Sequence, residues 1–270
     1  MKGVVFITGA SSGMGYATAK RFIENGYTVY GGARRIEKMQ TLPQLIPIKM
    51  DITKTEDIDF AVNKIVEECG RIDILFNNAG YGLFGAVESV SDEEYRKQFE
   101  VCLFGLAEVC KRVIPVMRKT CGGRIINNSS MAGKTYMPFG AWYIAAKHAV
   151  EALSDCMRFE LRPFNIKVVL IEPGNVESEW TGIMLENLKH TTSGTVYEDR
   201  ANGMIALTEK QKHFTPSETM AKIIYKAGTV KNPKTRYLRG KNTYTVYLRK
   251  ILGDKLYDRL FEKLIRTKQP

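Results

Sequence analysis

The amino-acid sequence predicts an α/β protein with a doubly wound parallel sheet between two layers of helices and a C-terminal helical extension. Two observations support this fold class. Short runs rich in Val and Ile, typical of buried strands, alternate with longer patterns of helical periodicity. A glycine-rich turn also separates the first run from the first helical pattern. Such alternation builds βαβ units, and therefore a parallel sheet.

The predicted elements follow in a regular order along the chain. We predict strands at 4–7, 28–30, 45–50, 72–76, 124–127 and 167–171, and helices at 16–25, 56–69, 91–118 and 142–161. Ser91 and Glu94 have the spacing of a capping box at the start of the third helix. Ligands bind at the carboxyl ends of the strands in such sheets, so we expect the functional residues in the loops that follow the strands.

Composition excludes several classes of protein. The 270 residues are 44% hydrophobic and 26% charged, as in ordinary globular proteins. No apolar run reaches about 18 residues, and the first residues do not resemble a secretory signal, so we expect a cytoplasmic protein. The five cysteines are irregularly spaced without a Cys-x-x-Cys pair, which argues against a disulfide framework and against a metal site.

The net charge of +11 is concentrated near the C-terminus, where residues 231–270 hold twelve Lys or Arg and three Asp or Glu. We predict a catalytic domain over residues 1–230, with 231–270 as a basic amphipathic extension of the same domain. The extension is expected to hold a last strand at 237–238 and two helices that meet at Gly253. These helices either lie on an anionic membrane surface or pack on their own domain, and we favour packing. No nucleic-acid motif accompanies the charge.

The turn from Thr8 to Gly15 has the spacing Gly-x-x-x-Gly-x-Gly and opens a helix. Glycine permits positive φ and a close approach of ligand to backbone. The free N–H groups at a helix N-terminus attract phosphate. Between a strand and a helix, the pattern indicates a dinucleotide site in a Rossmann-like fold. The residues expected to contact the cofactor here are Gly9, Ser11, Ser12, Gly13, Met14 and Gly15.

The loop after the second strand indicates which dinucleotide binds. It reads Gly31-Gly32-Ala33-Arg34-Arg35, with no carboxylate to bind a ribose 2′-hydroxyl. Arginine makes bidentate bonds with phosphate, so Arg34 and Arg35 predict NADP(H). A solvated surface position is the alternative for Arg35.

Three side chains predict the catalytic chemistry. Tyr143 and Lys147 are four residues apart on one predicted helix and therefore share a face, and Ser130 follows the fifth strand. An ammonium group near a phenol lowers its pKa from about 10, so we expect Lys147 to make Tyr143 an effective acid or base. Ser130 is expected to bind the substrate oxygen.

Together with Asn77-Asn78-Ala79-Gly80, these residues resemble the short-chain dehydrogenase/reductase family, over about residues 3 to 180. The segment from Ala33 to Arg35 and Met131-Ala132-Gly133-Lys134 resemble its branch of 17β-hydroxysteroid and retinol dehydrogenases. The resemblance implies hydride transfer with Tyr143 as acid/base, and Lys147 on the nicotinamide ribose. It also implies further cofactor contacts at Asp51, Ile52, Asn78, Ala79, Gly80, Tyr143, Lys147, Pro173, Gly174, Val176 and Ser178.

One position departs from the family pattern. Cys102 stands where the family commonly has an Asn that helps anchor a proton relay behind the lysine. A thiol is only a weak donor and acceptor. The relay is therefore lost, replaced or served by a backbone carbonyl, and the sequence leaves the three open.

The expected substrate is small and hydrophobic, because apolar and aromatic residues follow Ser178 and flank the catalytic stretch. We predict an NADP(H)-dependent interconversion of an alcohol and its ketone or aldehyde on a steroid-, retinoid- or lipid-like molecule. The alternatives are a 3-oxoacyl-carrier reductase and a non-catalytic NADP-binding regulator. The family resemblance also implies a homodimer or homotetramer, paired through the helices at 91–118 and 142–161.

Overall fold

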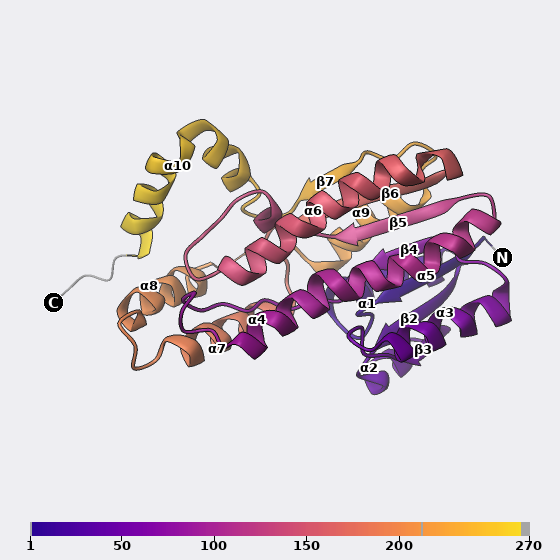
Figure 1. Ribbon diagram of the computed structural model, residues 1–270, viewed down its shortest axis with the longest axis horizontal. Coiled ribbons are helices and arrows are strands. Elements are labelled where there is room, and N and C mark those ends of the chain that lie inside the picture. The colour runs from indigo at the N-terminus through magenta and orange to yellow at the C-terminus, as the bar shows by residue number, and fades with distance from the viewer. Residues whose placement is uncertain (1, 212, 266–270) are drawn as a thin grey trace.

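The computed structural model describes residues 2–211 and 213–265 and has a three-layer αβα architecture (Figure 1). Its seven strands are all parallel and are ordered β3-β2-β1-β4-β5-β6-β7. Their bounds are β1 Val4–Thr8, β2 Thr28–Ala33, β3 Leu45–Lys49, β4 Ile74–Asn77, β5 Gly123–Asn128, β6 Ile166–Pro173 and β7 Arg236–Arg239. This is the predicted doubly wound sheet, whose order reverses between β1 and β4.

Helices cover both faces of the sheet because each strand is apolar on both sides. One core cluster joins the sheet to α3, α5 and α6, and another joins it to α1, α2 and α9. The described helices are α1 Gly13–Glu24, α2 Ile36–Gln40, α3 Thr55–Cys69, α4 Asp92–Phe99, α5 Gly105–Lys119, α6 Ala141–Leu161, α7 Trp180–Thr192, α8 Glu198–Glu209, α9 Ser217–Thr229 and α10 Tyr244–Ile265.

The helix predicted over 91–118 is interrupted. The capping box of Ser91 and Glu94 is present, but α4 and α5 are joined by a π-helical turn, Glu100–Phe104, that carries Cys102. A Cβ on Gly105 would lie 2.6 Å from the carbonyl oxygen of Ile52, so the helix passes very close to the loop after β3. The fourth strand begins at Ile74, two residues later than predicted.

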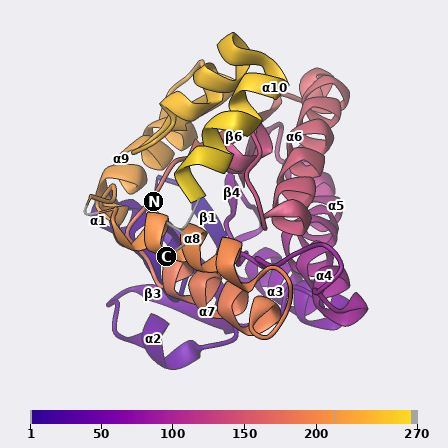
Figure 2. The ribbon, with the colours of Figure 1, turned by 90° about the vertical axis from the view of Figure 1, so that its left-hand side faces the viewer.

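The basic extension begins within the sheet, since β7 pairs with β6 and confirms the strand predicted at 237–238. The predicted break at Gly253 is also found, because that residue has φ 66° and ψ 175° inside α10. Figure 2 shows α10 arching above α8, which it contacts. Residues 266–270 of the extension lie outside the described residues. Within the described ranges, no helix is long and apolar enough to cross a membrane.

Candidate active site

The glycine loop makes a tight turn at the carboxyl end of β1 that only glycine accommodates. Gly9 and Gly13 have φ of 68° and 52°, a region that disfavours other residues. A Cβ on Gly15 would lie 2.3 Å from the carbonyl oxygen of Gly9. The Ser12 side chain makes no capping hydrogen bond to the first turn of α1. It therefore leaves the first N–H groups of the helix without a side-chain partner from Ser12. The uncapped, positively polarised N-terminus of α1 fits a dinucleotide pyrophosphate.

Hydrogen bonds tie the glycine loop to the segment after β4. The Thr8 hydroxyl accepts the backbone N–H groups of Asn78 at 3.0 Å and of Ala79 at 3.1 Å. The Asn78 side-chain amide donates to the Gly9 carbonyl at 3.1 Å. The predicted cofactor residues in the loops after β1 and β4 are therefore held together by hydrogen bonds, with Gly80 next in the chain.

Arg35 and its neighbour Lys38 meet a carboxylate that the sequence analysis did not single out. Arg35 Nη2 lies 3.0 Å from Glu179 Oε2, and Lys38 Nζ lies 2.5 Å from Glu179 Oε1. Arg35 also donates to the Ser12 hydroxyl at 3.4 Å. Glu179 thus links the loop after β2 to the start of α7, next to the glycine loop. The pairing depends on chain segments about 140 residues apart, so local pattern could not show it.

Asp51 and Ile52 lie after β3, where the sequence analysis placed them. The Asp51 carboxylate accepts both the backbone N–H and the hydroxyl of Thr53, at 3.0 and 2.8 Å. Burial opposes ionisation, but these bonds and the charge of Arg34 lower the pKa of Asp51 overall. Arg34 is exposed and near Asp51, and Ile52 is buried against Gly105.

Ser130, Tyr143 and Lys147 converge at the carboxyl edge of β5. Tyr143 and Lys147 are buried on one face of α6, with Lys147 Nζ 5.8 Å from the centre of the Tyr143 ring. Lys147 Nζ donates to the Asn128 carbonyl at 2.7 Å. Ser130 caps the short 3-10 turn Met131–Gly133, where its hydroxyl accepts the Ala132 N–H at 3.1 Å.

The expected lowering of the Tyr143 pKa is wrong for this structure. Burial raises the pKa of Tyr143 and outweighs the nearby Ser130 hydroxyl, which lowers it. Burial likewise lowers the pKa of Lys147. The phenol is therefore protonated at neutral pH, which suits a proton donor to a ketone oxygen.

Cys102 and Lys147 both lie close to Gly80. A Cβ on Gly80 would lie 3.3 Å from Cys102 Sγ and 3.9 Å from Lys147 Nζ. The thiol accepts the side-chain amide of Gln98 at 2.9 Å. Lys147 itself donates to a backbone carbonyl, that of Asn128.

Gln98 holds the loop beside the site and is a residue that the sequence analysis missed. Its side chain is fully buried, accepting the Leu83 N–H at 2.7 Å and donating to the Tyr81 carbonyl at 3.1 Å. We expect Gln98→Leu to lower the free energy of unfolding by about 3 kcal/mol, because two buried backbone groups lose their partners. Urea denaturation measures this. The exposed Gln40→Leu should change it by less than about 0.5 kcal/mol; equal effects would contradict the role.

The loop after β6 approaches the glycine loop. Gly174 N donates to the Arg239 carbonyl at 2.9 Å, and a Cβ on Gly174 would lie 1.9 Å from the Lys241 carbonyl oxygen. Val176 bridges to Thr215. A Cβ on Gly13 would lie 3.2 Å from the Cβ of Ser178, so the end of the segment Pro173–Ser178 lies next to the glycine loop.

A buried charge cluster lies behind the catalytic residues. Glu151, one turn after Lys147, and Glu172, just before Pro173, are both buried. Lys134 Nζ lies 3.1 Å from Glu151 and 3.4 Å from Glu172, and Arg236 Nε lies 3.1 and 3.2 Å from them. Burial, with the charge of Glu151, raises the pKa of Glu172 to about 7 despite Lys134.

This raised pKa predicts a pH dependence of stability. The folded-state pKa of Glu172 exceeds its ordinary 4.5. Its contribution to the free energy of unfolding is therefore full below about pH 4.5 and is lost as the pH rises through about 7. We expect the free energy of unfolding of the wild type to fall by about 2 kcal/mol across this pH range because of Glu172, and Glu172→Gln to remove that fall. Urea denaturation at several pH values measures both. Glu67→Gln, at an exposed site, should keep the wild-type slope; an unchanged slope in Glu172→Gln would contradict the assignment.

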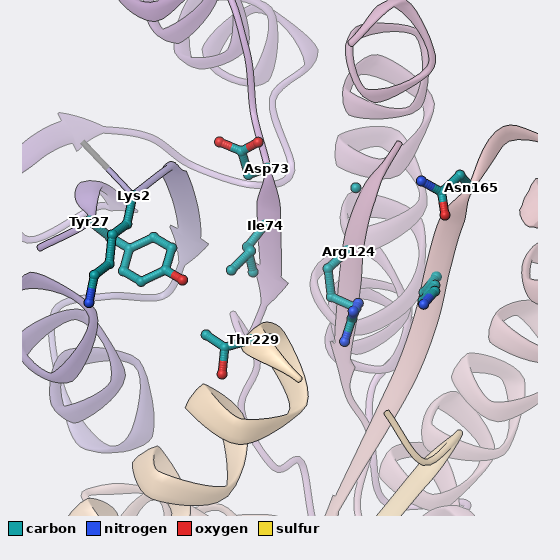
Figure 3. A pocket seen from close by; sticks show the side chains of 10 residues that line it. Lys2, Tyr27, Asp73, Ile74, Arg124, Asn165 and Thr229 are labelled. Carbon is teal, nitrogen blue, oxygen red and sulfur yellow. The ribbon is translucent and has the colours of Figure 1, made fainter. Parts of the chain in front are cut away.

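A hollow of about 290 Å³ opens at the opposite, amino edge of the sheet (Figure 3). Lys2, Asp73, Arg124 and Thr229 line it. Arg124 is already engaged, since its guanidinium donates to the backbone carbonyls of Ala227 and of Val230 at the end of α9. We therefore assign the hollow a structural role. Among the described residues, no group of His, Cys, Asp or Glu could hold a metal.

A Rossmann-like sheet with Ser, Tyr and Lys at its carboxyl edge defines a dinucleotide-dependent oxidoreductase. The sequence profile described as short chain dehydrogenase matches residues 3–188. The chain belongs to the short-chain dehydrogenase/reductase family. A short-chain dehydrogenase from Streptomyces avermitilis has a similar structure, with a TM-score of 0.78 and 28% identity over 98% of each chain.

Curated proteins similar in sequence include three reductases or dehydrogenases. The probable short-chain type dehydrogenase/reductase VdlC of Helicobacter pylori is 36% identical over 96% of each chain. The NADPH-dependent 3-dehydrocapnine reductase of Ornithobacterium rhinotracheale is 31% identical over 95% of each. The 3-ketodihydrosphingosine reductase of Bacteroides thetaiotaomicron is 40% identical, over 66% of this chain and 65% of its own length.

Proposed function

We propose that the protein is an NADP(H)-dependent reductase of a hydrophobic, lipid-like ketone, which it converts to the secondary alcohol. The observation that carries this proposal is the convergence of Ser130, Tyr143 and Lys147 between the glycine loop and an apolar cluster. Tyr143 belongs to that cluster itself. Its ring centre lies 5.2 Å from Trp180 and 6.0 Å from Phe84.

The three catalytic side chains have different roles in the proposed reduction. When bound, NADPH supplies the hydride that reduces the carbonyl carbon. The Ser130 hydroxyl holds the carbonyl oxygen, and the protonated Tyr143 phenol gives that oxygen its proton. Lys147 lies beside the phenol and is oriented by the Asn128 carbonyl. Its ammonium stabilises the phenolate that remains.

The apolar cluster supports a lipid-like substrate among the classes predicted. It joins the catalytic helix to α7, α8 and the end of α10, and it holds Phe84, Ala132, Tyr143, Ile144, Met184, Leu188, Ala201, Met204 and Ile265. Two relatives carry a 3-keto or 3-dehydro substrate in their names. A 3-ketone on a long chain matches both the cluster and those names. The 17β-hydroxysteroid and retinol branch stays a prediction.

A chain-length series tests the substrate class. With NADPH, we expect kcat/KM to rise by about tenfold or more from short to long 3-ketones, because each buried CH2 contributes about 0.8 kcal/mol. The panel includes 3-ketodihydrosphingosine, a steroid ketone, retinal and a 3-oxoacyl thioester. A thioester as the best substrate would favour the alternative of a 3-oxoacyl-carrier reductase, for which the basic extension is the only specific support.

The arginine loop supports NADP(H) as the cofactor, and one relative is named NADPH-dependent. Glu179 competes with a 2′-phosphate for Arg35 and Lys38, because it already pairs with both. We expect Glu179→Gln to tighten NADPH binding about fivefold, measured by fluorescence titration. NADH binding should not change, and Glu67→Gln serves as the control. Weaker NADPH binding in Glu179→Gln would mean that Glu179 instead helps retain the cofactor.

The regulator alternative is less well supported. A protein that only senses NADP(H) has no need of a buried Ser–Tyr–Lys set facing an apolar cluster. The Cys102 departure does not require loss of catalysis, since the Asn128 carbonyl partners Lys147.

We also propose a homodimer or homotetramer and a cytoplasmic setting. Phe104 and Phe159 are exposed at the junction of α4 and α5 and on α6, the helices expected to pair. All five cysteines are unpaired, which is compatible with a reducing compartment.

A further inference from the structure

Helix α10 has an inward face that packs on its own domain. Tyr257 is buried, with its hydroxyl 2.8 Å from that of Thr135 and its ring centre 5.1 Å from Tyr136. Ile265, at the end of the helix, joins the apolar cluster of Tyr143. The packing favoured from the sequence is therefore present, and α10 covers Thr135 and Tyr136 in the segment that follows the catalytic Ser130.

The acidic side chains of α10 are all engaged within the protein. Asp254 lies 3.4 Å from Arg249, Asp258 accepts the Tyr136 hydroxyl at 2.8 Å, and Glu262 lies 3.4 Å from Arg200. No ion pair within residues 2–211 and 213–265 involves four exposed cations of the helix, namely Lys250, Lys255, Arg259 and Lys263. The outward side of α10 is therefore positively charged.

Large apolar side chains stand among these cations. Ile251 is 81% exposed and Leu256 50% exposed, one on each side of the break at Gly253. Each lies next to a lysine in the sequence, Lys250 or Lys255. Figure 1 shows α10 bent into two arms that stand out at one end of the molecule. Tyr244, Tyr247 and Leu264 are also exposed along these arms.

Charge complementarity identifies what covers this surface. A second copy would present the same cations, and the two would repel. Exposed aliphatic and tyrosine side chains flanked by lysines instead match an anionic bilayer. Its acyl boundary accepts the apolar side chains, and its anionic headgroups attract the lysines.

We propose that the bend of α10, defined by Lys250, Ile251, Gly253, Lys255 and Leu256, binds the surface of a membrane containing anionic lipids. The helix lies on the bilayer without crossing it. Because the end of α10 also packs in the apolar cluster, binding of α10 to the membrane brings the active site close to the lipid phase. This proposal goes beyond the proposed function and is tested by binding alone, without cofactor or turnover.

The experiment is co-sedimentation of the full chain with vesicles of phosphatidylcholine, with and without phosphatidylglycerol. We expect partitioning only with the anionic lipid, weakened by salt. Lys250→Gln with Lys255→Gln should lower the partition coefficient about 25-fold, at about fivefold per cation. Ile251→Ser with Leu256→Ser should lower it about tenfold or more. Phe60→Ser, at an exposed apolar residue of α3, is the matched control and should bind as the wild type does.

Light scattering on the same variants completes the test. Vesicle binding that depends on the bend, with an unchanged oligomeric state, supports the proposal. Absence of binding to the anionic vesicles, or binding that all α10 variants retain, overturns it. A change in oligomeric state in the Ile251→Ser, Leu256→Ser variant would show that a second copy covers the surface and would also overturn it.

Discussion

Replacement of Tyr143 by Phe is expected to lower kcat for ketone reduction about 1,000-fold, within the range for loss of a positioned proton donor. Burial keeps the phenol protonated, and the substitution removes only the hydroxyl that supplies the proton. The ring remains to pack against Phe84 and Trp180. Steady-state kinetics with NADPH and the best ketone of the panel measure the change.

Two further measurements make this result specific to catalysis. The Kd for NADPH should change less than about twofold, since the phenyl ring keeps the packing of the site. Tyr27→Phe, at the amino edge of the sheet, should leave kcat unchanged. A Tyr143→Phe enzyme that retains more than about a tenth of the wild-type kcat would show that another group supplies the proton.

Substitution of Gly15 by Ala is expected to weaken NADPH binding about 100-fold or more. The new Cβ would lie 2.3 Å from the Gly9 carbonyl oxygen and 2.6 Å from the Asn78 side-chain amide. Since one contact is with backbone, the loop itself has to move, and the cradle for the pyrophosphate is lost. Fluorescence titration with NADPH measures the loss.

Gly182→Ala is the matched control for this substitution. Gly182 lies within α7, and a Cβ there would have no heavy atom within 4 Å. It should leave the Kd for NADPH unchanged and stabilise the helix slightly, since alanine has the higher helix propensity. Equal Kd values for the Gly15→Ala and wild-type proteins would mean that the dinucleotide does not bind in this loop.

Most of the fold was predictable because its signals are local. Each apolar run became a parallel strand of the sheet, and the capping box of Ser91 and the break at Gly253 were found where expected. The π-helical turn at Cys102 was not predicted, because the apolar pattern of 91–118 continues through it and gives no local signal of the interruption. Helices α7 to α9 were not predicted; α7 and α8 contribute to the apolar cluster of Tyr143, whereas α9 packs against the sheet.

The candidate site was predictable to a similar extent. Ser130, Tyr143 and Lys147 follow from spacing and from the rule that loops after parallel strands meet at one edge. Glu179 and Gln98 were missed, because each acts through partners that only the folded chain brings near. The direction of the Tyr143 pKa shift was wrong for the same reason. Proximity to Lys147 was visible in the sequence, whereas the burial that outweighs it was not.

Isotope transfer tests the central claim most directly. The protein is incubated with a long-chain 3-ketone and NADPH that carries deuterium at the transferable position of the nicotinamide, and the product is analysed by mass spectrometry. We predict a secondary alcohol with deuterium on the carbinol carbon, formed by the wild type and almost absent with Tyr143→Phe. Measurable NADPH binding with no label in any alcohol, across the whole panel, would contradict the assignment as a ketone reductase.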